Sequence, residues 1–325
     1  MSALYRPTLQ DVLKARKIIS RYLLRTPLYS YASLSRLLGA EVYIKHENHQ
    51  PIGAFKVRGG INLISQLSLE ERNRGVITAS SGNHGQSIAY ASRLFGVRAI
   101  AVCPENANPD KMESIKNLGA ELILHGEEFD DSRIYAEQMA QEKGYRYVHA
   151  GNEPLLIAGV GTLHLEILED LPDVDIIITP IGGGSGAAGA CIVAKAIRPT
   201  IRVIGVQAEL APAVYLSWKE GREVIRPSKT SADGLATRSP FKLPLEILRD
   251  LLDDFLLVSE AEIARAVLTL LEKTHNLAEG AGASPLAAAL KVRESLAGKK
   301  VVLVMSGGNL TLTALCDLLT KYNAP

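Results

Sequence analysis

Residues 174–186 read Val-Asp-Ile-Ile-Ile-Thr-Pro-Ile-Gly-Gly-Gly-Ser-Gly, and this stretch decides the fold class. Its apolar run is hydrophobic on both faces, as a parallel strand is when helices cover both sides of the sheet. A glycine turn follows the run, and an alanine-rich stretch of helical character follows the turn. This order predicts one strand–turn–helix unit of an α/β fold.

Eight further short apolar runs have the length and the β-branched composition of buried strands. Stretches with helical spacing separate them. We therefore predict an α/β protein with two open twisted sheets, mostly parallel, and helices on both faces. The predicted strands cover residues 41–47, 75–80, 98–104, 120–125, 145–150, 174–182, 201–209, 254–260 and 299–307.

The composition limits the class of protein and its partners. The chain has 325 residues, of which 47% are apolar and 22% charged, so it is long enough for about two domains and too apolar to be disordered. Its 36 Lys and Arg balance 35 Asp and Glu, which argues against nucleic acid or an anionic membrane as a partner.

The sequence also bears on the cellular location. We expect no secretory signal, because the first residues include several charges and no apolar run, and Pro180 and several glycines interrupt the one long uncharged stretch, residues 176–194. We therefore expect no membrane partner and a cytoplasmic location. Cys103, Cys191 and Cys316 are odd in number and far apart, so we expect reduced thiols.

Ligands of open parallel sheets bind beyond the carboxyl ends of the strands, and a glycine loop stands at one such end. The loop consists of Gly182, Gly183, Gly184, Ser185 and Gly186. Its backbone N–H groups and the helix N-terminus behind it suit a phosphate. A turn that serves only helix–sheet packing is the alternative.

The same region fits a second pattern. Gly184, Gly186 and Gly189 match G-x-G-x-x-G, and Glu209 ends the next predicted strand. A nicotinamide-dependent dehydrogenase is therefore a remote alternative.

Two other strand ends carry polar groups. One segment contains Ser80, Ser81, Asn83 and His84, whose hydroxyl, amide and backbone N–H groups suit a carboxylate or a phenolate oxygen. Ser306 follows the last strand. A plain helix cap is the alternative for both Ser81 and Ser306.

Lys56 lies between Phe55 and an apolar stretch that favours a helix. A lone lysine is usually a solvated surface charge. Desolvation here would lower its pKa and free the amine as a nucleophile or base. A phosphate site, such an amine and polar groups for a ring are together what a pyridoxal-phosphate enzyme needs.

The sequence resembles the fold-type II pyridoxal-phosphate enzymes, and within them the serine/threonine dehydratase and serine racemase branch. The resemblance covers nearly the whole chain and implies a tryptophan synthase β-like fold. It is carried by residues 45–59 (KHENHQPIGAFKVRG), 80–86 (SSGNHGQ), 158–162 (AGVGT), 182–186 (GGGSG), 278–283 (AEGAGA) and 306–309 (SGGN).

This resemblance implies a role for each matching residue. Lys56 would bind the cofactor aldehyde covalently and move the Cα proton, with Ser81 as a second catalytic residue. The cofactor, pyridoxal 5′-phosphate, would be held by Phe55, Lys56, Asn83, Gly182, Gly183, Gly184, Ser185, Gly186 and Ser306. The substrate carboxylate would be bound by Ser80, Ser81, Asn83 and His84, with Arg133 as a helper.

The branch implies an ammonia-lyase (dehydratase) that converts a β-hydroxy amino acid such as L-threonine or L-serine to a 2-oxo acid and ammonia. An amino-acid racemase is the alternative, because Ser81 matches the serine that protonates the opposite face of the carbanion in the racemases. Ser306 cannot keep the pyridine nitrogen protonated as a carboxylate would, and we interpret this as favouring elimination over transamination.

Some residues depart from the branch. Gln207 and Ala213 stand where relatives with a divalent-metal site have acidic residues, so we expect no metal site there. Val160 replaces a common glutamine, which hints at a substrate other than plain threonine. Glu279 is expected either near the site or as a helix cap.

The resemblance also implies a domain organisation. Residues 1–73 and 149–325 would form a large cofactor-binding domain and residues 74–148 a small one, which would close over the substrate. A homodimer is expected. Because Pro325 follows soon after the last motif, we expect no C-terminal regulatory domain and no feedback by isoleucine.

Overall fold

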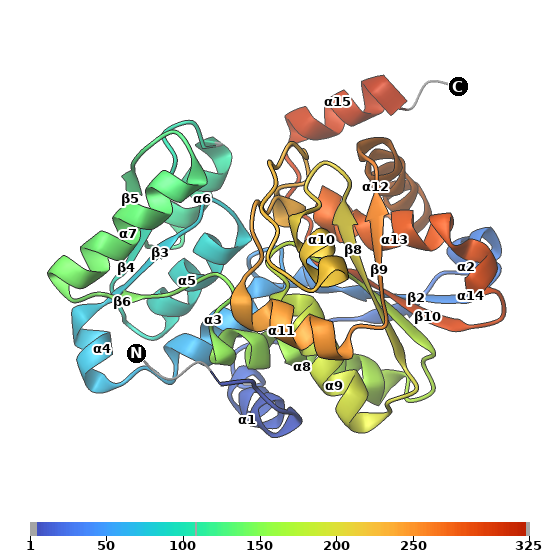
Figure 1. Ribbon diagram of the computed structural model, residues 1–325, viewed down its shortest axis with the longest axis horizontal. Coiled ribbons are helices and arrows are strands. Elements are labelled where there is room, and N and C mark those ends of the chain that lie inside the picture. The colour runs from blue at the N-terminus through green and yellow to red at the C-terminus, as the bar shows by residue number, and fades with distance from the viewer. Residues whose placement is uncertain (1–4, 108, 323–325) are drawn as a thin grey trace.

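The computed structural model describes residues 5–107 and 109–322, and they form an α/β fold with two sheets (Figure 1). The strands are β1 (Leu28–Ser30), β2 (Glu41–His46), β3 (Val76–Ala79), β4 (Ala99–Cys103), β5 (Glu121–Leu124), β6 (Arg146–Tyr147), β7 (Ile176–Pro180), β8 (Arg202–Ala208), β9 (Asp254–Val258) and β10 (Lys300–Met305). The six-stranded sheet has the order β1-β2-β10-β7-β8-β9, and the four-stranded sheet the order β5-β4-β3-β6.

The pairing of the strands is parallel except at one edge. Strand β10 lies between β2 and β7, with Val301 opposite both Val42 and Ile176. Strand β1 pairs antiparallel with β2 at the edge of the larger sheet. The predicted fold class, with two mostly parallel sheets and helices on both faces, is therefore confirmed.

Helices connect the strands and cover both sheets. They are α1 (Leu9–Ile19), α2 (Ala32–Leu38), α3 (Lys56–Ile64), α4 (Leu69–Arg74), α5 (Asn83–Leu94), α6 (Pro109–Asn117), α7 (Phe129–Lys143), α8 (Pro154–Asp170), α9 (Ser185–Ile197), α10 (Ala213–Glu220), α11 (Lys242–Leu251), α12 (Glu260–Thr274), α13 (Gly280–Lys291), α14 (Arg293–Leu296) and α15 (Leu312–Tyr322), with short 3-10 turns η1 (Glu47–His49) and η2 (Asp233–Leu235).

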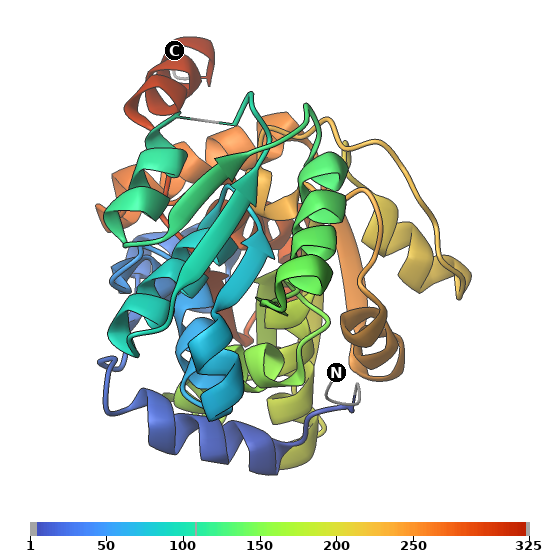
Figure 2. The same ribbon diagram turned by 90° about the vertical axis from the view of Figure 1, so that its left-hand side faces the viewer.

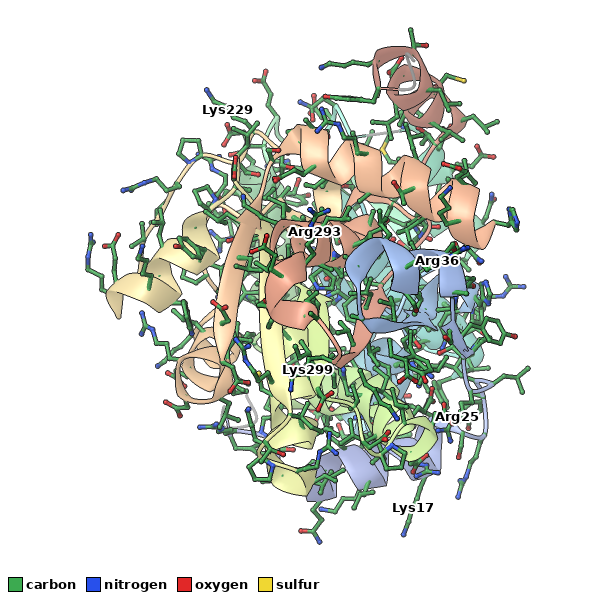
Figure 3. The ribbon with its side chains drawn as sticks, turned by 90° about the vertical axis from the view of Figure 1, so that its right-hand side faces the viewer. Lys17, Arg25, Arg36, Lys229, Arg293 and Lys299 are labelled. Atoms are coloured by element: carbon green, nitrogen blue, oxygen red, sulfur yellow. The ribbon has the colours of Figure 1, made fainter. Side chains whose placement is uncertain are left out.

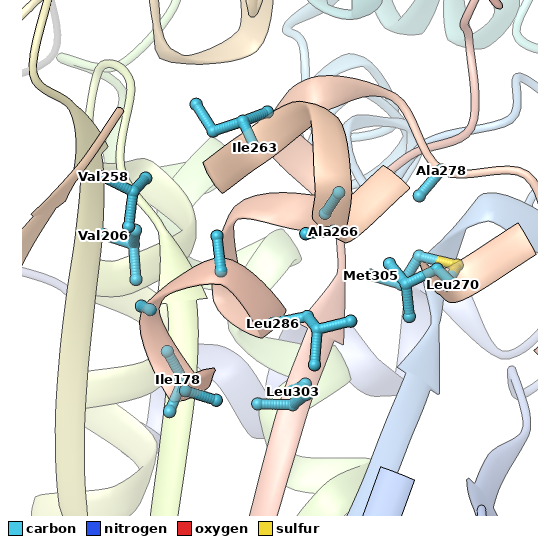
Figure 4. Close-up of a cluster of buried hydrophobic side chains, with 14 of the residues drawn as sticks. Ile178, Val206, Val258, Ile263, Ala266, Leu270, Ala278, Leu286, Leu303 and Met305 are labelled. Atoms are coloured by element: carbon cyan, nitrogen blue, oxygen red, sulfur yellow. The ribbon is translucent and has the colours of Figure 1, made fainter. Parts of the chain in front are cut away.

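Each predicted strand contains an observed strand, and the alternation of side chains along β7 shows why. Ile176 and Ile178 pack with residues of α12 and α13 on one face (Figure 4). Ile177 packs with α8 and α9 on the other. Because both faces are buried, three consecutive positions of the strand, Ile176 to Ile178, are apolar, which is the pattern that the sequence shows.

The smaller sheet is also covered on both faces (Figure 2). Ile77 and Ile100 pack against Ala136 of α7. On the opposite face, Val76 and Ala99 belong to a core cluster shared with α3, α5 and α8. All four strands of this sheet lie within residues 74–148, and the boundaries of a separate domain there stay a prediction.

The surface agrees with the balanced charge. The basic side chains labelled in Figure 3 are spread over the face away from the smaller sheet and form no single patch there. In the described part of the chain, no helix has the length and apolar character needed to cross a membrane. Cys103 and Cys191 are buried free thiols, and Cys316 is an exposed one.

Candidate active site

A cavity of about 580 Å³ lies between the two sheets. The chain lines it from the carboxyl ends of β3, β7 and β10 and from the start of α3, as expected for parallel sheets. The predicted site residues that border it are Phe55, Lys56, Ser80, Ser81, Asn83, His84, Gly182, Gly183, Gly184, Ser185, Gly186 and Ser306.

Lys56 opens helix α3 and directs its amine into this cavity. The Nζ atom donates to the Ser185 hydroxyl at 3.0 Å and lies 5.2 Å from the centroid of the Phe55 ring. Burial lowers the pKa of Lys56 to about 8. At pH 7 about a tenth of the amine is therefore unprotonated, far more than for a solvated lysine, and this fraction is free to act as a nucleophile or base.

The glycine loop joins the end of β7 to the start of α9. Gly184 is the N-cap of α9 and has φ +90°, a left-handed conformation that a side chain would strain. The first backbone N–H groups of a helix have no partner within it, so they are free to bind an anion. This set of donors, together with Ser185 and the Lys56 amine, fits a phosphate with a reactive group beside it.

The loop after β3 supplies hydroxyl and amide groups. Ser80 Oγ accepts from the backbone N–H of Gly82 at 3.2 Å and of Gly85 at 3.1 Å, which fixes the turn before α5. His84 Nε2 lies 2.9 Å from the Thr78 hydroxyl, and burial lowers the pKa of His84 to about 3. His84 is therefore a neutral hydrogen-bonding group in this site.

Ser306 directly follows β10 and is almost fully buried. Its carbonyl accepts from the Phe55 backbone N–H at 2.9 Å, so the end of β10 and the start of α3 are held together. The Ser306 side chain borders the cavity with Lys56. Residues 250 positions apart in sequence thereby share one site.

The structure does not bring Arg133 to this cavity. Arg133 lies on α7, where its guanidinium bonds Asp130 at 3.2 Å and Glu137 at 3.0 Å. Both partners lie within four residues on the same helix. A helper role for Arg133 has no geometric support, because these acidic neighbours hold the side chain along the surface of α7.

Glu279, which the sequence left between a site residue and a helix cap, borders the cavity and is also the N-cap of α13. Its Oε1 accepts from Asn83 Nδ2 at 2.8 Å. Burial raises the pKa of Glu279 to about 7.

The lining residues that sequence reasoning missed include Lys111, Asp233 and Phe241. Lys111 of α6 and Asp233 of η2 form an ion pair that joins the two sides of the cavity. Asp233 and Phe241 both lie within residues 227–244, where Ser, Thr, Gly and Pro cluster, a composition typical of a surface or active-site loop.

The positions that would hold a divalent metal in some relatives carry no carboxylate. Gln207 is buried at the end of β8, and its Oε1 accepts from the Tyr215 backbone N–H at 3.0 Å. Ala213 is buried and apolar. Within residues 5–107 and 109–322, no group of three or more potential ligand side chains gathers, and the lack of a metal site stays a prediction.

Comparisons with known proteins agree with this geometry. The family model described as "Pyridoxal-phosphate dependent enzyme" matches residues 19–307. An L-threonine ammonia-lyase of Thermotoga maritima is 42% identical over 97% of this chain and 78% of its own length. A maize serine racemase structure superposes with a TM-score of 0.92, at 34% identity and 98% coverage of both chains. The processed threonine deaminase isoform 2 of Solanum lycopersicum superposes with a TM-score of 0.91, at 31% identity, covering 96% of this chain and 91% of its own.

Proposed function

The chain belongs to the pyridoxal-phosphate dependent enzyme family, and from this premise we propose that it is an ammonia-lyase (dehydratase). Its substrate is a β-hydroxy amino acid such as L-threonine or L-serine, and its products are a 2-oxo acid and ammonia. The observation that carries the proposal is the half-buried Lys56 amine beside the glycine loop, in a chain 42% identical to an L-threonine ammonia-lyase.

The residues of the cavity fit the cofactor. The N–H groups of the glycine loop and the hydroxyl of Ser185 would hold the phosphate, Asn83 and Phe55 would lie beside the ring, and the Lys56 amine would hold the aldehyde carbon. Ser80, Ser81 and His84, together with the backbone N–H of Asn83 at the start of α5, would receive the substrate carboxylate through neutral donors, since the pKa of His84 is held low by burial.

When bound, the cofactor supplies a conjugated ring that takes up the negative charge left at Cα. Lys56 is the residue that moves the Cα proton. Its amine is suited to this because desolvation lowers its pKa to about 8, so that it is neither permanently charged nor too weak a base near neutral pH. Ser306, which borders the cavity, would face the ring nitrogen with a hydroxyl, and a hydroxyl would not keep that nitrogen protonated as a carboxylate would.

Two measurements test the proposal. Purified protein is incubated with L-threonine and with L-serine, and 2-oxo acid and ammonia are measured. Lys56→Ala should abolish both products and the borohydride-stabilised pyridoxyl adduct found at Lys56 by mass spectrometry. Lys195→Ala serves as the matched control. The Lys195 amine donates to Asp253 at 2.7 Å, and Lys195 does not border the cavity. An adduct on another residue, or product release by Lys56→Ala, would refute the assignment.

A racemase activity is the second candidate, because Ser81 borders the cavity and the chain resembles a serine racemase over 98% of its length. Chiral analysis of residual serine separates the two reactions. The nicotinamide-dependent alternative has no such support, since Glu209 is exposed and bonds Lys291 outside the cavity.

The proposal extends to the cellular location and the oligomeric state of the enzyme. We infer that the enzyme acts in the cytoplasm as a homodimer, because its charge is balanced and the branch that it resembles forms dimers. Size-exclusion chromatography with light scattering tests the dimer. A single species of monomer mass would contradict it.

A further inference from the structure

Three hydrogen bonds form a chain that begins at a backbone carbonyl and ends at a carboxyl group in the cavity. Asn309 Nδ2 donates to the Ile52 carbonyl at 2.9 Å and to Asn83 Oδ1 at 2.7 Å. Asn83 Nδ2 in turn donates to Glu279 Oε1 at 2.8 Å. These bonds connect the segment before α3, the residue that begins α5, the N-cap of α13 and the loop after β10.

The Ile52 carbonyl sets the donor and acceptor roles in this series of hydrogen bonds. A peptide carbonyl only accepts, so the Asn309 atom that faces it must be the amide nitrogen. That nitrogen's second N–H reaches Asn83, so the Asn83 atom opposite must be the amide oxygen. A reversed Asn83 would place two amide nitrogens against each other and its oxygen against the Glu279 carboxyl.

These hydrogen bonds therefore determine which atoms of the Asn83 amide remain free for a ligand. Its oxygen is occupied by Asn309, and one of its N–H groups by Glu279. Among the bonds of the described residues, none takes its second N–H, and Asn83 borders the cavity. Asn83 can thus present a donor to a bound group but not an acceptor.

We propose that Asn309 and Glu279 are positioning residues that lock the Asn83 amide with an N–H toward the cofactor's ring oxygen. The proposal rests on the proposed placement of the cofactor ring beside Asn83. A locked donor stabilises that oxygen in its anionic form, because hydrogen bonds to charged groups are stronger than neutral ones. Neither residue needs to touch the cofactor to have this effect.

Gly53 makes the arrangement possible. A Cβ at Gly53 would lie 2.5 Å from Asn309 Oδ1, and Gly53 has φ +66°, so a side chain would be excluded by both space and backbone conformation. Gly308 N–H also donates to the Gly53 carbonyl at 2.9 Å. Gly53, two residues before Phe55, therefore leaves the space that the side chain of Asn309 in the SGGN segment occupies.

The test measures how well the full chain, freed of cofactor, distinguishes two ligands. Pyridoxal 5′-phosphate and its 3-deoxy analogue differ only in the ring oxygen. The parent protein should bind pyridoxal phosphate tighter by about tenfold to a hundredfold, the range of one hydrogen bond to a charged group. Asn309→Leu and Glu279→Leu should each lose most of this preference and leave the affinity for the analogue unchanged.

Two variants separate positioning from general damage. Glu279→Gln keeps an acceptor for Asn83 Nδ2 and should retain the preference. Asn62→Leu is the matched control: Asn62 is also a buried amide that donates to a backbone carbonyl, that of Leu155 at 2.7 Å, but it does not border the cavity. It should affect both ligands alike.

The outcomes are distinct. If Asn309→Leu keeps the preference or weakens both ligands equally, the positioning role is wrong. If Asn309→Leu does not fold, Asn309→Ser and Glu279→Leu decide by the same comparison. A parent protein that binds both ligands equally overturns the inference and leaves the proposed function standing, whereas one that binds no pyridoxal phosphate overturns the proposed function itself.

Discussion

Glu279→Gln should remove a pH-dependent loss of stability from this protein. Burial raises the pKa of Glu279 from 4.5 to about 7, so the folded protein retains a proton that the unfolded chain has released. The stabilisation is complete below about pH 4.5 and is lost as the pH rises through about 7. Lys111, Asn83 and the Asn309 backbone lower this pKa, and Asp233 raises it, but desolvation outweighs them.

The size of the effect follows from the shift. At about 1.36 kcal/mol per pKa unit, a rise from 4.5 to about 7 corresponds to about 3 kcal/mol of unfolding free energy. Because the carboxyl borders the cavity, solvent screening reduces this figure, and we expect a measured change between about 1 and 3 kcal/mol. Glutamine does not ionise, so the variant loses none of this unfolding free energy as the pH rises.

The assay is urea unfolding of both proteins, without cofactor, at several pH values from about 5 to about 8. His84, which is buried, and His149, which is half-buried, act in the opposite direction, because desolvation lowers the pKa of each, but they contribute equally to both proteins. The stability of the parent minus that of Glu279→Gln should therefore fall across this range. A difference that stays constant with pH would refute the reasoning.

Three other predictions follow from named contacts. Ser306→Asp should slow 2-oxo acid release and increase transamination by-products, because a carboxylate would keep the pyridine nitrogen protonated. Chromatography of the products would detect this change. An unchanged rate and product spectrum would contradict the inference that the Ser306 hydroxyl favours elimination. Arg58→Met should lower the unfolding free energy by about 3–5 kcal/mol, because the fully buried Glu47 loses its partner at 2.8 Å, and thermal melting measures this loss. Lys111→Met should raise KM for the amino acid more than it lowers kcat, because it removes the ion pair with Asp233 across the cavity; steady-state kinetics with an unchanged KM would exclude that role.

The strands could be predicted because their chemistry is local. A parallel strand buried on both faces is a continuous apolar run, and each such run contains a strand. Strand β1 (Leu28–Ser30) was missed because it is short, lies at the edge of the sheet and is mostly exposed. Nothing in its composition separates it from a loop.

The site residues also divide into those that the local sequence predicts and those that only the folded structure brings together. Lys56, the glycine loop and Ser306 stand at element ends, where the sequence itself gives a reason to look. Arg133 was placed by resemblance alone, and its acidic neighbours on α7 hold it elsewhere. The bond between Asn309 and Asn83 joins residues 226 positions apart, so it exists only once β10 has been placed between β2 and β7.

Two kinds of contact between the smaller sheet and the rest of the protein differ in what they cost to break. Lys111 pairs with Asp233, and Arg238 with Glu128, but at least one partner of each pair is largely exposed, and such pairs separate at little cost. By contrast, Val76 and Ala99 of the smaller sheet share one buried cluster with α3 and α8, which would lose apolar burial if the sheets parted. We therefore predict that opening for a substrate costs least at the rim, where α6 and the start of α7 meet the residues before α11, and that the strand ends bordering the cavity stay in place.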